Sequence, residues 1–256
     1  RRELHMIRSH TFAAFDSTVY GVAPDSTNRL FLSQLLSSVC GSYVDGWGQT
    51  NVFSAPVGVD VKSVGVDVAI MRTNGVACID TLDALVQVTL AKERFAQANI
   101  IVEMGSLVFF DAPPQVDVDN WCMRTSDTSQ SLTQNARSVL HEAISAVTNG
   151  AGNRCLIFVP SIRDTPNHQI AGLATAKYRF MYAVDRAYTD HCLISASQIA
   201  PFVSAHELCH ALGVHAHVSD KCNLMFSTVT PFTDVRASKR LYIGQTRAMR
   251  LGEHVQ

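Results

Sequence analysis

The feature that most constrains the fold is a cluster of histidines toward the C-terminal end of the chain. His206, Glu207 and His210 form the pattern H-E-x-x-H. On an α-helix, residues i and i+4 lie on one face, so both imidazoles can reach a single metal ion if this segment is helical. The apolar flanks predict a helix over residues 200–212, which Gly213 ends. The pattern therefore predicts a helix that carries a metal site.

The residue types in this pattern are those of a catalytic zinc site. Imidazole nitrogens bind zinc, and zinc lowers the pKa of a bound water to about 7. Glu207 falls beside the ligand face and can accept a proton from such a water, as a general base that does not bind the metal. The alternative is that the two histidines are hydrogen-bonded core residues. The further histidines and Met225, which follow at once, favour the zinc site.

Residues 206–213 resemble the metzincin metalloproteases, whose pattern is H-E-x-x-H-x-x-G-x-x-H followed by a turn that contains methionine. The third histidine is displaced in this chain. Ala216 stands three residues after Gly213, with His215 and His217 on either side of it. Both of these histidines are therefore candidates for the third ligand.

The spacing to the methionine favours one of the two. In the matrix metalloproteinases the third histidine precedes the methionine by eight residues, and an aspartate follows it by three. Met225 has His217 eight residues before it, and Asp220 follows that histidine by three. The resemblance therefore implies His217 as the third ligand, with His215 as the alternative, and Met225 as an apolar floor under the imidazoles. Asp220 is expected to be a turn residue or to support a ligand.

Two upstream segments are loosely similar to the adamalysin (reprolysin) branch of the same family. Residues 99–111 resemble its second strand, and residues 171–174 resemble its edge strand. In that branch the edge strand pairs with the backbone of an extended substrate, a form of β-augmentation. The resemblance therefore implies that Gly172, Leu173 and Ala174 bind the backbone of a peptide substrate.

Apolar periodicity predicts strands that alternate with helices along much of the chain. The predicted strands cover residues 64–72, 99–110, 155–160 and a stretch beginning at Ala171, and the predicted helices cover residues 80–98, 131–148, 200–212 and 241–251. This alternation is typical of an α/β or α+β domain with one mostly parallel sheet. The resemblance implies a twisted sheet, an active-site helix and a small helical C-terminal subdomain.

The N-terminal part is predicted to be separate from the catalytic unit, with a boundary between residues 1–63 and 64–256. Residues 40–56 are rich in Gly, Ser, Asn and Gln, which favours a linker. Cys40 is followed by Gly41, and the resemblance makes this pair similar to the zymogen pro-segment whose thiolate caps the zinc. The alternative is that Cys40 is a disulfide partner or a buried thiol.

The chain has seven cysteines, an odd number, and no C-x-x-C pair. At least one thiol is then unpaired, and up to three disulfides are expected. Cys209 is expected either to pack in the core or to pair, with Cys222 as its candidate partner. The cysteine content and the resemblance favour secretion or another oxidising compartment.

Composition excludes several other classes of protein. Hydrophobic residues make up 47% of the chain, which is enough to form a buried core, and charged residues make up only 17%. The net charge of −1 lacks the basic excess of a nucleic-acid-binding protein. No apolar run approaches the roughly 20 residues that span a bilayer.

The resemblance implies a zinc-dependent endopeptidase that hydrolyses extended protein or peptide substrates with a zinc-activated water, Glu207 being the general base. The displaced third histidine motivates one alternative, a metzincin-like protein with weak or no activity that acts as a structural or interaction component. A second alternative is another zinc-dependent amide hydrolase.

Overall fold

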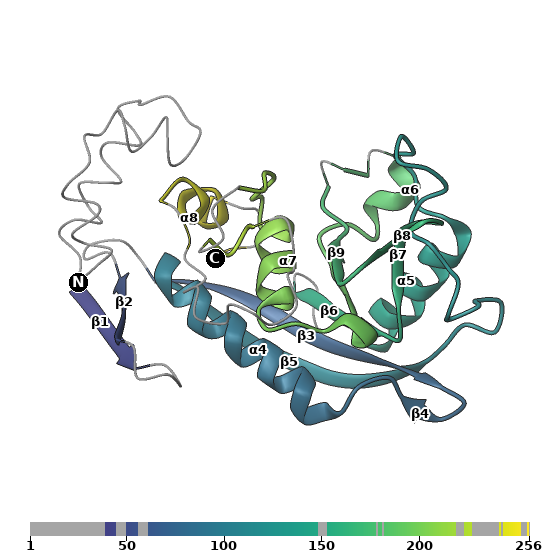
Figure 1. Cartoon of the computed structure of the whole chain (residues 1–256), viewed down its shortest axis with the longest axis horizontal. Coiled ribbons are helices and arrows are strands. Elements are labelled where there is room, and N and C mark those ends of the chain that lie inside the picture. The colour runs from purple at the N-terminus through teal and green to yellow at the C-terminus, as the bar shows by residue number, and fades with distance from the viewer. Residues whose placement is uncertain are drawn as a thin grey trace.

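A computed structural model defines most of the chain from residue 61 onward (Figure 1). The residues it describes are 39–44, 50–55, 61–147, 153–177, 179–180, 182–218, 223–226, 241, 243–251 and 255. The fold is α/β, with a mostly parallel sheet and helices on both faces, which confirms the predicted class. Within the described residues, no helix combines the length and the apolar character that crossing a bilayer requires.

One sheet forms the centre of this fold. Its strands are β3 (Lys62–Thr73), β4 (Val76–Ala77), β5 (Ile100–Asp111), β6 (Arg154–Val159), β9 (Gly172–Ala174) and β10 (Cys192–Ser195). The parallel pairs are β3 with β5, β3 with β6, and β6 with β10, whereas β4 and β9 pair antiparallel to their neighbours. The strand order ends at β9, so this short strand lies at the edge of the sheet nearest the histidine helix.

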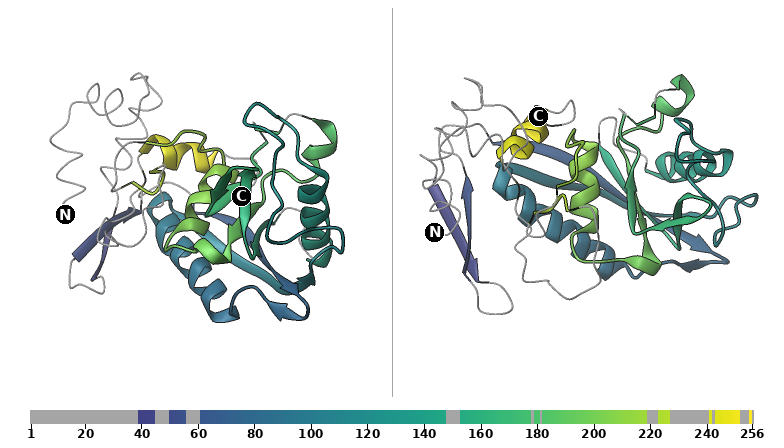
Figure 2. Two further views of the ribbon diagram at one scale, coloured as in Figure 1. Left: turned by 45° about the vertical axis from the view of Figure 1, so that its right-hand side comes forward. Right: turned by 45° about the horizontal axis from the view of Figure 1, so that its top comes forward.

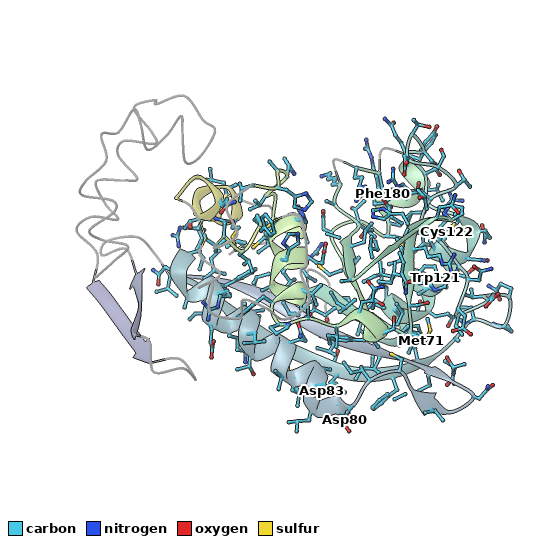
Figure 3. All side chains as sticks on the ribbon, in the orientation of Figure 1. Met71, Asp80, Asp83, Trp121, Cys122 and Phe180 are labelled. Carbon is cyan, nitrogen blue, oxygen red and sulfur yellow. The ribbon has the colours of Figure 1, made fainter. Side chains whose placement is uncertain are left out.

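Three helices cover the sheet: α4 (Thr81–Phe95), α5 (Gln134–Ala146) and α7 (Val203–Ala211). Helix α4 begins one residue after the start of its predicted range, because Asp80 caps it: the Asp80 side chain accepts a hydrogen bond from the backbone N–H of Leu82 at 2.7 Å. Figure 3 shows Asp80 and Asp83 at this end of α4. Helix α5 begins three residues later than its predicted range, after the capping residue Thr133.

The remaining elements are short. They are η2 (Ala96–Ala98), β7 (Ile162–Thr165), β8 (His168–Ile170), α6 (Ala183–Arg186), η3 (Ala196–Gln198) and α8 (Ile243–Arg250). Strands β7 and β8 form a separate antiparallel pair. Helix α8 lies within the predicted C-terminal helix of residues 241–251.

Strand β3 divides the buried apolar residues into two clusters, because successive side chains point to opposite faces of a strand. Val66, Val68 and Ile70 face the cluster that α4 and α7 cover. Ala69 and Met71 face the cluster that α5 covers, which also contains Trp121 and Phe180. Figure 2 shows α4 and α7 on one side of the sheet and α5 on the other. Helix α7 is therefore held between α4, the sheet and the edge strand.

The prediction of a linker over residues 40–56 is wrong in part. The structure has an antiparallel hairpin in this region, formed by β1 (Val39–Val44) and β2 (Thr50–Ala55). Each strand contains β-branched and aromatic residues that favour extended structure, and the Gly and Ser content of the segment obscured them. Cys40 lies in β1 opposite Ser54, and its side chain is outside the described part of the chain.

The prediction of disulfides is wrong for the five cysteines whose side chains are described, since all five are free thiols: Cys78, Cys122, Cys155, Cys192 and Cys209. Cys155 and Cys192 lie on neighbouring strands but point into different core clusters, so they cannot meet. The Cys209 thiol packs against Met249, with 3.8 Å between the two sulfur atoms. Cys222 lies outside the described residues. The described cysteines therefore give no support to an oxidising compartment.

Candidate metal centre

Helix α7 is anchored at both of its ends. Before the helix, Phe202 adopts a left-handed conformation with φ 71°, and the buried Gln87 side chain of α4 donates to the carbonyl of Ala200 at 3.1 Å. The same amide accepts from the backbone N–H of Ser204 at 3.4 Å. The helix ends before Gly213, whose φ of 99° suits glycine, as the sequence predicted. These contacts fix the direction in which the histidines point.

Three histidine side chains converge at one point. The Nε2 atom of His217 lies 3.2 Å from Nε2 of His206 and 3.1 Å from Nε2 of His210. Two nitrogens bound tetrahedrally to one zinc at about 2.0–2.1 Å would lie about 3.3 Å apart, so these spacings fit a shared metal ion. His206 and His210 are buried, whereas His217 is exposed. Together they can supply three nitrogen ligands and leave a further position open.

Backbone carbonyls set the tautomers of the two helical histidines. Nδ1 of His206 lies 2.7 Å from the carbonyl oxygen of Leu224, and Nδ1 of His210 lies 2.6 Å from that of Val214. A carbonyl oxygen can only accept, so Nδ1 must carry the proton and Nε2 must present a lone pair. The Nε2 lone pairs of His206 and His210 then both face Nε2 of His217, an arrangement that fits a shared metal ion.

A turn at residues 223–226 supplies one of these carbonyls. The Asn223 side chain accepts from the backbone N–H of Met225 at 2.7 Å and shapes the turn. The backbone N–H of Val218, next to His217, donates to the carbonyl of Met225 at 2.9 Å. Met225 itself is fully buried. The same turn therefore bonds both to His206 and to the residue next to His217. The role of Met225 as an apolar floor under the imidazoles stays a prediction.

The side chain of Glu207 points from α7 toward the edge strand β9. This side chain is buried, and its Oε2 atom accepts a hydrogen bond from the backbone N–H of Ala174 at 2.8 Å. Burial raises the pKa of Glu207 to about 8, while the Ala174 N–H group and the positive charge of Arg179 act in the lowering direction. At neutral pH the carboxyl group of the metal-free protein is therefore mostly protonated.

The same environment keeps the imidazoles neutral. Burial lowers the pKa of His210 to about 3, and nearby His206, His217 and Arg179 add to this lowering. Burial and the charge of Arg179 also lower the pKa of His217. Neutral imidazole is the form that binds metal, so these directions favour metal binding down to acidic pH.

Sequence reasoning did not identify Arg179 as part of this environment. Its guanidinium group lies 2.8 Å from a carboxylate oxygen of Asp164. The two oxygens of the same carboxylate also accept one hydrogen bond each from Arg124. The three residues are far apart in the sequence, and no local pattern links them. Only the folded chain brings this positive charge near Glu207 and His217.

Strand β9 presents backbone groups away from the sheet. The Ala171 carbonyl accepts from the N–H group of Ser195 in β10, and the Thr175 N–H group donates to the carbonyl of His191, just before β10, at 2.8 Å each. Because hydrogen-bonding directions alternate along an antiparallel strand, the backbone groups of Gly172 and Ala174 point to the other side. The Ala174 N–H group is the one that bonds Glu207. The structure thus places the predicted edge strand directly beside the predicted base.

The remaining predicted site residues lie elsewhere. His215 is exposed and is not part of the histidine group. Asp220 and the side chain of Cys40 are outside the described residues.

The metal-free protein is expected to lose stability as the pH rises from 6.5 to 8. Folding raises the pKa of Glu207 from 4.5 to about 8. Its stabilising contribution to the free energy of unfolding is therefore complete below pH 4.5 and is lost as the pH rises toward 8. Folding lowers the pKa of His210 from 6.5 to about 3. Its stabilising contribution to the free energy of unfolding is therefore complete above pH 6.5 and is lost as the pH falls toward 3. Urea unfolding of metal-free wild type and Glu207→Gln at pH 6.5 and 8 isolates the first effect. Equal losses in the two proteins would contradict it.

Comparisons with known proteins identify similar architectures only. No family model matches the chain, and no curated protein matches it. Metalloproteinase-II from Bacteroides fragilis aligns at TM-score 0.41 and 13% identity over 67% of this chain, which spans about half (48%) of that protein. Mature mirolysin of Tannerella forsythia, in complex with a cleaved peptide, aligns at TM-score 0.47 and 12% identity, covering 75% of this chain and 91% of that one.

A chain from a chaperone–substrate complex aligns at TM-score 0.40 and 10% identity, covering 84% of this chain and 39% of that one. The structural neighbours thus include metalloproteinases, and all of these likenesses are distant. The residues of the chain itself carry the functional conclusion.

Proposed function

We propose that the chain is a zinc-dependent endopeptidase of the metzincin type, with His206, His210 and His217 as the metal ligands. The observation that carries the proposal is the convergence of three imidazole Nε2 atoms beside a buried carboxyl group. The tautomers fixed by the Leu224 and Val214 carbonyls support it, because they leave lone pairs at the point of convergence.

The nature of the donors favours zinc. Three neutral imidazoles with an open fourth position are typical of catalytic zinc sites, whereas calcium and magnesium take oxygen ligands. Zinc bound there would supply a Lewis acid and would lower the pKa of a coordinated water toward neutrality.

Glu207 is the proposed general base. Burial raises the pKa of Glu207 in the metal-free protein, and the positive charge of zinc bound at the three imidazoles would lower it again, which would leave a carboxylate able to accept a proton. Its carboxylate oxygens would take the proton from the attacking water and then deliver it to the departing amine. The hydrogen bond from the Ala174 N–H group to Oε2 would hold the carboxylate in place for both transfers.

The proposed substrate is an extended peptide that lies along β9. The outward-facing backbone groups of Gly172 and Ala174 offer an edge to which a peptide strand can pair. The N–H group of Ala174 is already bonded to Glu207, so the groups that would pair with the peptide are the Gly172 N–H and C=O and the Ala174 C=O.

The division into residues 1–63 and 64–256 belongs to the same proposal. In it, the first part precedes the catalytic unit, and Cys40 is a candidate thiol for capping the zinc. Raised peptidase activity in Cys40→Ala, relative to the unaltered chain, would support this role, and unchanged activity would exclude it.

The decisive experiment combines turnover with metal dependence. The purified chain, loaded with one equivalent of Zn²⁺, is expected to cleave an unstructured protein such as casein. A chelator is expected to abolish the cleavage, and added Zn²⁺ to restore it. Stoichiometric zinc without turnover of any protein substrate would contradict the proposal and favour the non-enzymatic alternative. Cleavage of small amides but not of peptides would favour the amide hydrolase.

A further inference from the structure

Gly172 of β9 faces two side chains of α7. A Cβ atom placed on Gly172 would lie 2.8 Å from Cγ and 3.0 Å from Oε1 of Glu207, and 3.0 Å from Cγ2 of Val203. Val203 and Glu207 are four residues apart on α7 and therefore share one face of the helix. At such distances the two elements could not keep their positions if residue 172 carried a side chain.

Glu207 has little freedom to avoid such a contact. Its side chain is only 7% exposed, and its Oε2 atom is held by the backbone N–H of Ala174. The opposing strand is fixed as well, because Gly172 pairs with Ile194 and Ala174 pairs with Cys192 of β10. The obstacle met by a new Cβ would include Cγ, in the middle of the Glu207 side chain, so rotating the carboxylate end alone would not relieve it.

We infer that Gly172 is a positioning residue for Glu207. Because residue 172 has no side chain, the carboxyl group can lie against β9, with one oxygen bonded to Ala174. A methyl group at this position would push Glu207 away from the Ala174 N–H group. This inference rests on the proposed function, since the group that Gly172 positions is the proposed general base.

The expected effect is on turnover rather than on metal binding. A displacement of about 1 Å in a catalytic group can lower the rate by about 100-fold. Gly172→Ala is therefore expected to lower kcat by about that factor, with zinc content close to that of the wild type. The histidine tautomers depend on the Leu224 and Val214 carbonyls, which this substitution does not touch.

A cycle of variants distinguishes positioning of Glu207 from general packing between helix and strand. Gly172→Ala is made in the full wild-type chain, in Glu207→Ala and in Val203→Ala, and the urea midpoint of each protein is measured without metal. If Glu207 is the obstacle, the added methyl lowers the midpoint in the wild type and in Val203→Ala but not in Glu207→Ala. Relief by Val203→Ala alone, or by neither background, would overturn the inference.

This stability cycle needs no enzymatic activity. If the wild type proves inactive while the coupling between residues 172 and 207 is present, the proposed function fails and the contact stands. If the wild type is active and Gly172→Ala retains its full kcat, the inference fails and the proposed function stands. If Gly172→Ala does not fold, Gly172→Ala combined with Glu207→Ala is expected to fold, and failure of that double variant to fold would also overturn the inference.

Discussion

Replacing His217 by alanine is expected to lower the zinc affinity of the chain by more than about 100-fold, because even residues that only orient a ligand contribute about 10–100-fold. His215→Ala is expected to leave the affinity unchanged. The reason is geometric, since Nε2 of His217 lies within 3.2 Å of both helical imidazoles and His215 is outside the group. Competition with a chromophoric chelator gives the affinity of each variant.

The two histidines make a matched pair for this experiment. Both are exposed and they are two residues apart, so the two variants compare two imidazoles of the same segment. Zinc retained by His217→Ala but lost by His215→Ala would reverse the assignment. Zinc retained by both variants would mean that the third ligand is another residue. Circular dichroism of the metal-free variants serves as the control that both are folded.

The strongest parts of the fold prediction came from long periodic segments with clear ends. Helix α4 was found because Asp80 is a capping residue and apolar residues recur at helical spacing after it. Helix α7 was found because the histidine spacing requires a helix and Gly213 supplies its left-handed end. In both cases the information lies within a few neighbouring residues.

Short elements were missed because the sequence marks them weakly. Strand β10 has only four residues, Cys192–Ser195, all of them buried, and a run of this length has no measurable period. The hairpin of β1 and β2 is hidden in the composition, because its Gly and Ser residues accompany the few Val, Tyr and Phe residues, which do not alternate along either strand.

The surroundings of the site were the least predictable part. The histidine ligands were proposed from spacing, but the contacts that orient them come from distant or irregular segments. Leu224 supplies a carbonyl to His206 from eighteen residues away, and Ala174 supplies an N–H group to Glu207 from thirty-three. Backbone groups have no residue identity, so a sequence pattern cannot mark them. The constraint on Gly172 arises in the same way, from the approach of a strand to a helix.

Replacing Glu207 by glutamine is expected to lower kcat by about 100- to 10,000-fold, the usual contribution of a general acid–base group. Glutamine has nearly the same shape, and its carbonyl oxygen can still accept the hydrogen bond from Ala174. The amide cannot take a proton from water at neutral pH. The substitution therefore removes proton transfer and keeps the packing between α7 and β9.

Zinc content separates this effect from damage to the metal centre. Glu207→Gln is expected to bind zinc as tightly as the wild type, because its side chain is bonded to β9 and is not part of the histidine group. His206→Ala serves as the contrasting variant, since it is expected to lose both zinc and turnover. A drop of less than about 10-fold in kcat for Glu207→Gln would be too small for a general base. Loss of zinc from this variant would instead show that Glu207 acts through the metal site.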